Sequence, residues 1–241
     1  MKRDLQIFSQ PELLAGHVGD LLMNRIACSL SDRFHLALSG GSTPNLLFSA
    51  LSSKYADSAL WQKTHFWWVD ERMVPSQDPE SNFGMAQKLL FSKIAIPGNN
   101  IHPIHGEVDP LEESGNYAST IRQALPVIDE FPVFDLILLG MGEDGHTASI
   151  FPNHPELLYS DRICEVAHHP VTNQPRITLT GRVINNADAV WFLVTGTGKA
   201  ERLAEVFSRS EISGKLPSAH IHPVHGEMSW FVDEPASRLI S

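Results

Sequence analysis

Short apolar runs alternate along the chain with stretches of helical periodicity. The apolar runs are three to seven residues long and end at glycine or polar residues, which is typical of buried strands. The helical stretches repeat apolar residues every three or four positions, as in Leu14, Val18 and Leu22. Strands are predicted at residues 34–39, 65–69, 134–139, 162–167, 176–179, 189–195 and 230–232. Helices are predicted at residues 11–31, 44–51, 81–91, 111–125 and from 200 to about 208.

This alternation predicts the fold class. Strands that are apolar at nearly every position are buried on both faces, and helices between them act as crossovers. We therefore expect an α/β fold with a mostly parallel sheet. The length of 241 residues allows one large domain or two small ones, and no low-complexity stretch or long linker divides the chain. We expect a single domain over residues 1–241.

The charge of the chain restricts its partners. The formal net charge is −10, which argues against nucleic acid, because binding the phosphate backbone requires a basic face. A small anionic substrate stays possible, because a few local donors suffice to bind a phosphate. The expected partner is a small molecule, with the protein itself a monomer or weak homodimer.

The location of the protein is predicted from what the sequence lacks. No apolar run reaches the roughly 18 residues that a membrane helix needs. The first eight residues lack the apolar segment of a signal peptide. Cys28 and Cys164 are far apart and lie outside any C-x-x-C pattern, which suits a reducing compartment. We expect a cytoplasmic protein.

Four polar or glycine-rich loops follow predicted strands, where ligands bind in open α/β sheets. The first contains Gly40, Gly41, Ser42 and Thr43. Its glycines let the backbone approach an anion, its hydroxyls are donors, and the next helix offers unpaired N–H groups. It is either a phosphate cradle or an ordinary turn into a helix.

The second loop, V-D-E-R, places an arginine at the end of a strand. Arg72 can pair with a phosphate or a carboxylate as a planar fork. Asp70 and Glu71 would orient Arg72 or take part in proton transfer. The alternative is a salt bridge at the surface, which is common for such a sequence.

The third loop, residues 139–152, contains a candidate base. His146 is its only side chain that is a natural base near neutral pH, and Asp144 lies two residues earlier, where it can orient the ring or a water. Gly140, Gly142 and Gly145 bring the backbone near a substrate. Their spacing does not match the dinucleotide-binding pattern.

The fourth loop places Lys199 at the start of a helix, a position suited to a phosphate. It is not a Walker A loop, because the spacing differs and Ala200 stands where a Ser or Thr would bind magnesium. The alternative is that Lys199 is an exposed lysine at the start of a helix, without a ligand. Arg176 begins the segment R-I-T-L-T and either reaches the same rim or lies at a strand edge on the surface.

One heptapeptide occurs twice in closely similar form, as I-H-P-I-H-G-E at residues 101–107 and I-H-P-V-H-G-E at residues 221–227. Its histidines and glutamates could ligate zinc in principle. H-P-x-H is not a helical ligand spacing, so we favour two similar strand-to-loop segments. We therefore expect no metal at these two segments.

These loops, in this order, resemble those of the 6-phosphogluconolactonase family. The match rests on L-S-G-G-S-T-P, V-D-E-R-M-V-P, S-N-F-G-M-A, L-G-M-G-E-D-G-H-T-A-S-I-F-P, R-I-T-L-T and L-V-T-G-T-G-K-A, and it spans almost the whole chain. The resemblance implies a Rossmann-like three-layer α/β/α sandwich, hydrolysis of a phosphorylated sugar lactone, and no cofactor. It implies that His146 is the base, and it matches Arg72, the loop at residues 40–43 and Lys199 to family positions.

Two alternatives stay open. The family also resembles the glucosamine-6-phosphate deaminases, which carry a carboxylate just before the proline where this chain has Phe151 and Pro152. That difference favours the lactonase. A non-catalytic sugar-phosphate sensor would need the phosphate cradle but not His146, Asp144 and Arg72.

Overall fold

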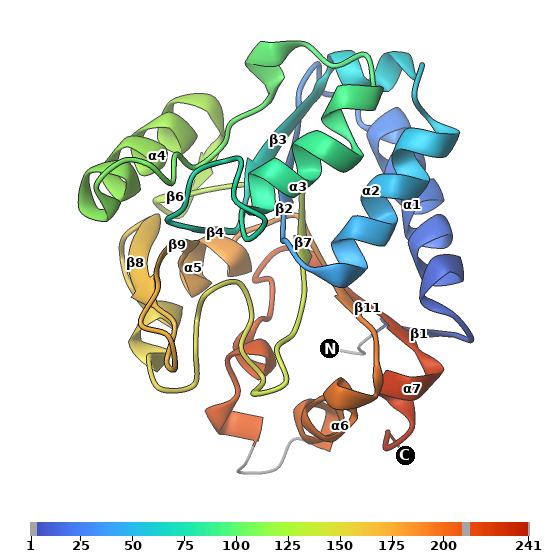
Figure 1. Cartoon of the computed structure of the whole chain (residues 1–241), viewed down its shortest axis with the longest axis vertical. Helices are drawn as coiled ribbons and strands as arrows, with labels where there is room; N and C mark the ends of the chain where they lie inside the picture. The colour runs from blue at the N-terminus through green and yellow to red at the C-terminus, as the bar shows by residue number, and fades with distance from the viewer. Residues whose placement is uncertain (1–3, 209–212, 241) are drawn as a thin grey trace.

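A six-stranded parallel sheet forms the centre of the molecule (Figure 1). The structure is a computed structural model that describes residues 4–208 and 213–240, so residues 1–3, 209–212 and 241 of the expected domain lie outside the description. Every neighbouring pair of strands in this sheet is parallel. The strands are, in spatial order, β1 (Asp4–Phe8), β11 (Glu227–Asp233), β10 (Ala189–Val194), β7 (Leu136–Leu139), β2 (Phe34–Leu38) and β3 (Thr64–Trp68).

Helices cover both faces of this sheet. Three of them lie side by side, with α2 between α1 and α3 (Figure 1). Strands β2 and β10 are buried at every position, which requires cover on both sides. The expected α/β sandwich with a mostly parallel sheet is confirmed. The helices are α1 (Pro11–Cys28), α2 (Ser42–Lys54), α3 (Asn82–Leu89), α4 (Pro110–Ala124), α5 (Gly181–Asn185), α6 (Ala200–Ser208) and α7 (Glu234–Ser237).

A second, antiparallel sheet lies beside the first. Its order is β4 (Asp70–Arg72), β9 (Pro175–Leu179) and β8 (Cys164–His168). The segment D-E-R is therefore a strand and not the loop that we predicted. Val69 alone separates β4 from β3, and its carbonyl accepts a hydrogen bond from Leu179 N at 2.7 Å, so the chain passes directly from one sheet into the other.

The remaining elements are short. A hairpin joins β5 (Val127–Ile128) and β6 (Phe131–Pro132). The 3-10 turns are η1 (Ala59–Gln62), η2 (Phe91–Lys93), η3 (Gly98–Asn100), η4 (Pro155–Leu158), η5 (Thr197–Lys199), η6 (Ser213–Lys215) and η7 (Pro217–His220). Within residues 4–208 and 213–240, no helix is both long and apolar enough to cross a membrane.

The core is one continuous cluster of apolar side chains drawn from both halves of the chain. Trp61, Trp67, Trp68 and Trp230 are fully buried. Both sheets contribute to it, through residues such as Phe192 of β10 and Ile177 of β9. The loops at the carboxyl ends of the strands are thus held by a single packed body, which fixes their positions relative to one another.

Candidate active site

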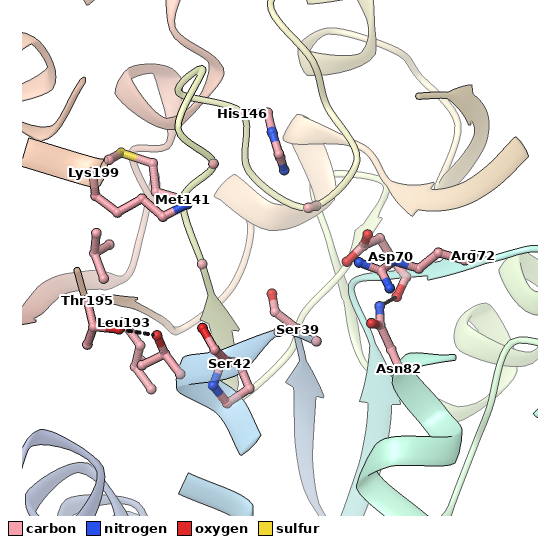
Figure 2. A pocket seen from close by; sticks show the side chains of 18 of the residues that line it. Ser39, Ser42, Asp70, Arg72, Asn82, Met141, His146, Leu193, Thr195 and Lys199 are labelled. Carbon is pink, nitrogen blue, oxygen red and sulfur yellow. Dashed lines mark hydrogen bonds between the residues drawn. The ribbon is translucent and has the colours of Figure 1, made fainter. Parts of the chain in front are cut away.

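A pocket of about 260 Å³ opens at the carboxyl ends of β2, β7 and β10 (Figure 2). All four predicted loops reach it, because the carboxyl ends of parallel strands meet at one edge of a sheet. Nine of the ten predicted site residues line it: Gly40, Gly41, Ser42, Thr43, Asp70, Arg72, His146, Arg176 and Lys199. The tenth, Asp144, does not line the pocket but contacts the ring of His146.

The first loop turns from β2 into α2 at the floor of the pocket. Gly41 has φ of 114°, a conformation that side-chain-bearing residues rarely adopt, and as the N-cap it gives no side-chain cap to α2. The first-turn N–H groups of α2 are therefore available to a ligand. Thr43 Oγ1 lies 2.7 Å from Thr195 Oγ1, which joins this loop to the loop after β10.

Lys199 ends the short turn η5 and lines the same side of the pocket as Ser42 and Thr195 (Figure 2). Burial lowers the pKa of Lys199, while the nearby charges of Glu143 and Asp144 act in the opposite direction. An ammonium that is half-buried beside a helix N-terminus gains from an anionic ligand. This side of the pocket is therefore suited to a phosphate.

His146 lies above the pocket (Figure 2), and its ring contacts Asp144. Its Nδ1 is 2.6 Å from Asp144 Oδ1, which also accepts a hydrogen bond from the backbone N of His146 at 3.0 Å. With the proton held on Nδ1, the neutral ring keeps its lone pair on Nε2. Burial alone would raise the pKa of Asp144, but the hydrogen bonds and charge of His146 outweigh it and lower that pKa. His146 is thus placed to act as a general base, with Asp144 holding the orientation of its ring.

Close backbone approach makes this pair possible. A Cβ atom at Gly142 would lie 2.2 Å from His146 Nδ1 and 2.5 Å from Asp144 Oδ1, so only glycine fits there. Gly142 N donates to the carbonyl of His146 at 2.8 Å, which closes the loop around the two side chains. The glycines of this loop thus serve the geometry of the base as well as access for a ligand.

Arg72 and Arg176 are opposite each other in the antiparallel pair of β4 and β9. Arg72 Nη1 donates to the carbonyl of Glu80 at 2.5 Å, and Arg176 Nη2 donates to Gln174 Oε1 at 3.4 Å. The Nε atoms of both arginines are buried and have no hydrogen-bond partner among the described residues. Burial lowers the pKa of Arg176; Asp70 opposes this shift and Arg72 adds to it. Two adjacent cations with unused donors favour a bound anion.

The two carboxylates of D-E-R have different surroundings. Asp70 faces the pocket and accepts a hydrogen bond from Ser149 Oγ at 2.7 Å. Glu71 points away and accepts from the backbone N of Asn82 and of Phe83 at 2.8 Å each, at the start of α3. Burial raises the pKa of Glu71, and these backbone hydrogen bonds partly offset the rise. Glu71 therefore caps α3 and does not orient the Arg72 guanidinium, which corrects one of our expectations.

Three polar residues that line the pocket, Ser39, Asn82 and Thr195, were not among the predicted site residues. Asn82 Nδ2 donates to the carbonyl of Asp70 at 2.9 Å. Thr195 could have been found, because it belongs to the loop that contains Lys199. Asn82 lies in the stretch S-N-F-G-M-A that resembles the family, but its residue type gave no chemical signal, because it begins a helix and reaches the pocket only through tertiary packing.

The two histidine-containing repeats lie in different surroundings. The ring of His102 stacks on Trp67 with centroids 3.9 Å apart, whereas His225 Nε2 lies 3.1 Å from Asp129 Oδ2. Among residues 4–208 and 213–240, no group of three or more His, Cys, Asp or Glu side chains is placed to hold a metal ion. The repeats are similar segments in two unrelated places.

Comparison with known proteins identifies the family. The model of the glucosamine-6-phosphate isomerases/6-phosphogluconolactonase family matches residues 9–230. The 6-phosphogluconolactonase of Haemophilus influenzae is 43% identical over 89% of this chain and 91% of its own, and that of Homo sapiens is 37% identical over 98% and 93%. The structure of the Trypanosoma brucei 6-phosphogluconolactonase superposes with a TM-score of 0.90 at 25% identity, covering 100% of this chain and 99% of its own. The chain belongs to this family.

Proposed function

We propose that the chain hydrolyses 6-phospho-D-glucono-1,5-lactone to 6-phosphogluconate, the hydrolytic step of the oxidative pentose phosphate pathway. The observation that carries this proposal is the His146–Asp144 pair, with a 2.6 Å contact, above a pocket that has cationic side chains at its rim. The names of the relatives from Haemophilus influenzae and Homo sapiens agree with it. A base and sites for anions are what lactone hydrolysis of a sugar phosphate requires.

The phosphate is bound at the start of α2, by the backbone of residues 40–43 and the Ser42 and Thr43 hydroxyls. Lys199 adds a positive charge from the neighbouring loop after β10, and Arg176 is the further cation within reach of the pocket. The helix N-terminus and the ammonium both favour a dianion. This anchoring places the lactone carbonyl carbon near His146, and positioning of this kind lowers the barrier.

His146 acts as a general base and then as a general acid. Nε2 takes a proton from water, and the hydroxide attacks the carbonyl carbon to give a tetrahedral oxyanion. Arg72 or the backbone N–H groups of the loop at residues 140–145 stabilise that charge. The bond to the ring oxygen then breaks, and His146 returns the proton to the departing oxygen. Asp144 stabilises the imidazolium between the two steps. A δ-lactone is already reactive, so no covalent nucleophile is needed, and base catalysis contributes about 10²- to 10⁴-fold.

The replacement of His146 by alanine tests this proposal. A sugar-phosphate dehydrogenase generates the lactone at slightly acidic pH, where spontaneous hydrolysis is slow, and its loss is followed. We expect His146→Ala to lower kcat by at least about 100-fold with KM little changed. His154→Ala is the matched control, because His154 Nδ1 contacts Glu156 at 3.0 Å two residues away but lies outside the pocket.

Two results would overturn the proposal. Wild-type protein that gives no acceleration over the blank removes the lactonase, and release of ammonia from glucosamine-6-phosphate would then identify a deaminase. Tight binding of 6-phosphogluconate without turnover would identify a sugar-phosphate sensor. Activity of His146→Ala within a few-fold of wild type would instead show that another group is the base.

The wider setting of the enzyme is also part of the proposal. The whole chain acts as one catalytic domain, since one core connects both sheets. The active form is a monomer or weak homodimer without nucleic acid, because the pocket is complete within one chain that carries a net charge of −10. The thiols Cys28 and Cys164 are both free, which supports the cytoplasm as the compartment. Light scattering across a concentration series measures the oligomeric state.

A further inference from the structure

Phe151 contacts two functional side chains of the pocket without lining the pocket itself. Its side chain is fully buried, with 0% exposure. The centroid of its ring lies 4.8 Å from that of His146, with the planes at 52°. The guanidinium carbon of Arg176 lies 5.8 Å from the same centroid, above the ring. One apolar ring is therefore shared by the proposed base and by one of the proposed anion-binding cations.

The third neighbour of the ring is His169, in the loop between β8 and β9. The two rings meet edge to face with centroids 5.5 Å apart. His169 Nδ1 accepts hydrogen bonds from the backbone N of Val171 and of Thr172, at 3.3 and 3.2 Å, so its own position is fixed by the loop. His169 thus limits the movement of Phe151 on a further side.

The turn before Phe151 is held against the antiparallel sheet. In this tight turn, Ile150 N donates to the carbonyl of Thr147 at 2.9 Å and Ala148 adopts a positive φ of 50°. Ser149, in the same turn, donates its hydroxyl to Asp70 of β4 and its backbone N to Thr178 Oγ1 of β9. The strained Ala148 conformation persists because these contacts determine it. The turn therefore ties the His146 loop to the antiparallel sheet.

We propose that Phe151 is a positioning residue that sets the orientation of the His146 imidazole and the Arg176 guanidinium through one shared ring. The inference rests on the proposed lactonase function. A ring face attracts cations, and in this reaction His146 becomes cationic while Arg176 is cationic throughout. The ring also excludes water from one side of His146, which limits the orientations that the imidazole adopts. The attraction of cations needs an aromatic ring at residue 151, whereas the exclusion of water needs only an apolar side chain of similar size.

The test compares Phe151→Leu with Phe134→Leu. Phe134 is also 0% exposed, but it packs against Trp67 in the core and does not line the pocket. The same substitution at both positions removes a buried ring and leaves a branched apolar side chain. We expect Phe151→Leu to lower kcat about tenfold, the effect of one cation–π contact, and to raise KM severalfold through Arg176. Phe134→Leu is expected to lower Tm but to keep kcat and KM within twofold.

A binding measurement separates the effect of Phe151 on Arg176 from its effect on His146. Calorimetric titration with 6-phosphogluconate measures anion binding, to which Arg176 contributes, without turnover. The Kd of 6-phosphogluconate is expected to rise severalfold in Phe151→Leu and to stay unchanged in Phe134→Leu. The inference is overturned if Phe151→Leu and Phe134→Leu have equal kcat and Kd at equal Tm. Should Phe151→Leu fold poorly, Phe151→Met is measured in the same way, because the unbranched methionine side chain adapts to the space that the ring leaves. Failure of the wild-type enzyme to hydrolyse the lactone is a separate result and tests the proposed function.

Discussion

Replacement of Asp144 by asparagine separates the role of its charge from the role of its shape. The asparagine Oδ1 can still accept a hydrogen bond from His146 Nδ1, so the orientation of the imidazole is kept. What is lost is the negative charge beside the imidazolium that forms when His146 takes a proton from water. Asp144 does not line the pocket, so substrate binding should be little affected.

The size of the effect follows from the contact. A hydrogen bond to a charged group contributes about 1.5–3 kcal/mol. The Nδ1–Oδ1 distance of 2.6 Å places this one among the strong, charge-assisted bonds. The Asp144 side chain is 43% exposed, so solvent screening reduces the value, and we take about 2 kcal/mol. That corresponds to a fall in kcat of roughly 30-fold, with KM within about threefold of wild type.

The assay is the coupled measurement of lactone loss, with Glu156→Gln as the matched control. Glu156 contacts His154 Nδ1 at 3.0 Å, also two residues away, but this pair lies outside the pocket. Glu156→Gln is expected to leave kcat unchanged. If kcat of Asp144→Asn stays within threefold of wild type, Asp144 does not stabilise a cationic His146, and the base mechanism proposed above is wrong in this part.

Two further perturbations test the fold around the pocket and the far end of the sheet. Burial, and then the charges of neighbouring histidines, lower the pKa of His35 and of His102 to about 4. The unfolded chain therefore binds these protons at higher pH than the folded protein, so the free energy of unfolding should fall as the pH is lowered from about 7 to about 4. At pH 5, His35 alone should lower the free energy of unfolding by about 2 kcal/mol relative to pH 7. Urea unfolding at pH 7 and pH 5 measures it, and a pH dependence that is no smaller in His35→Gln would contradict the assignment. A Cβ at Gly40 would lie 1.8 Å from Asn82 Oδ1, so Gly40→Ala should raise KM at least about tenfold and lower Tm. Gly16→Ala, where the added Cβ meets nothing within 4 Å, is the control, and equal KM values in the two variants would refute the argument.

The sequence by itself determined the sheet and the loops that surround the pocket. The apolar runs of β2, β7 and β10 are local signals, because a strand buried on both faces must be apolar at nearly every position. The glycines and hydroxyls that follow these strands are local signals too. A parallel sheet brings its carboxyl ends to one edge, so the loops containing Thr43, His146 and Lys199 could be predicted to meet.

Elements with weak local signals were missed. β1 is an edge strand whose positions are exposed or half-buried, so its sequence carries little apolar pattern. β4 is only three residues long and consists of Asp70, Glu71 and Arg72, which read as a polar loop. Its strand conformation comes from pairing with β9, a segment far away in the sequence, and no local pattern records that pairing.

The tertiary structure alone decided how the charged groups of the pocket are divided. Pairing of β4 with β9 places Arg72 beside Arg176, and the alternation of side chains along β4 turns Asp70 toward the pocket and Glu71 toward α3. Packing of α3 brings Asn82 under the first loop, where a Cβ at Gly40 would meet it. Residue type and loop position are properties of the local sequence. Which charged groups face one another depends on contacts between distant segments, and these form only when the core is packed.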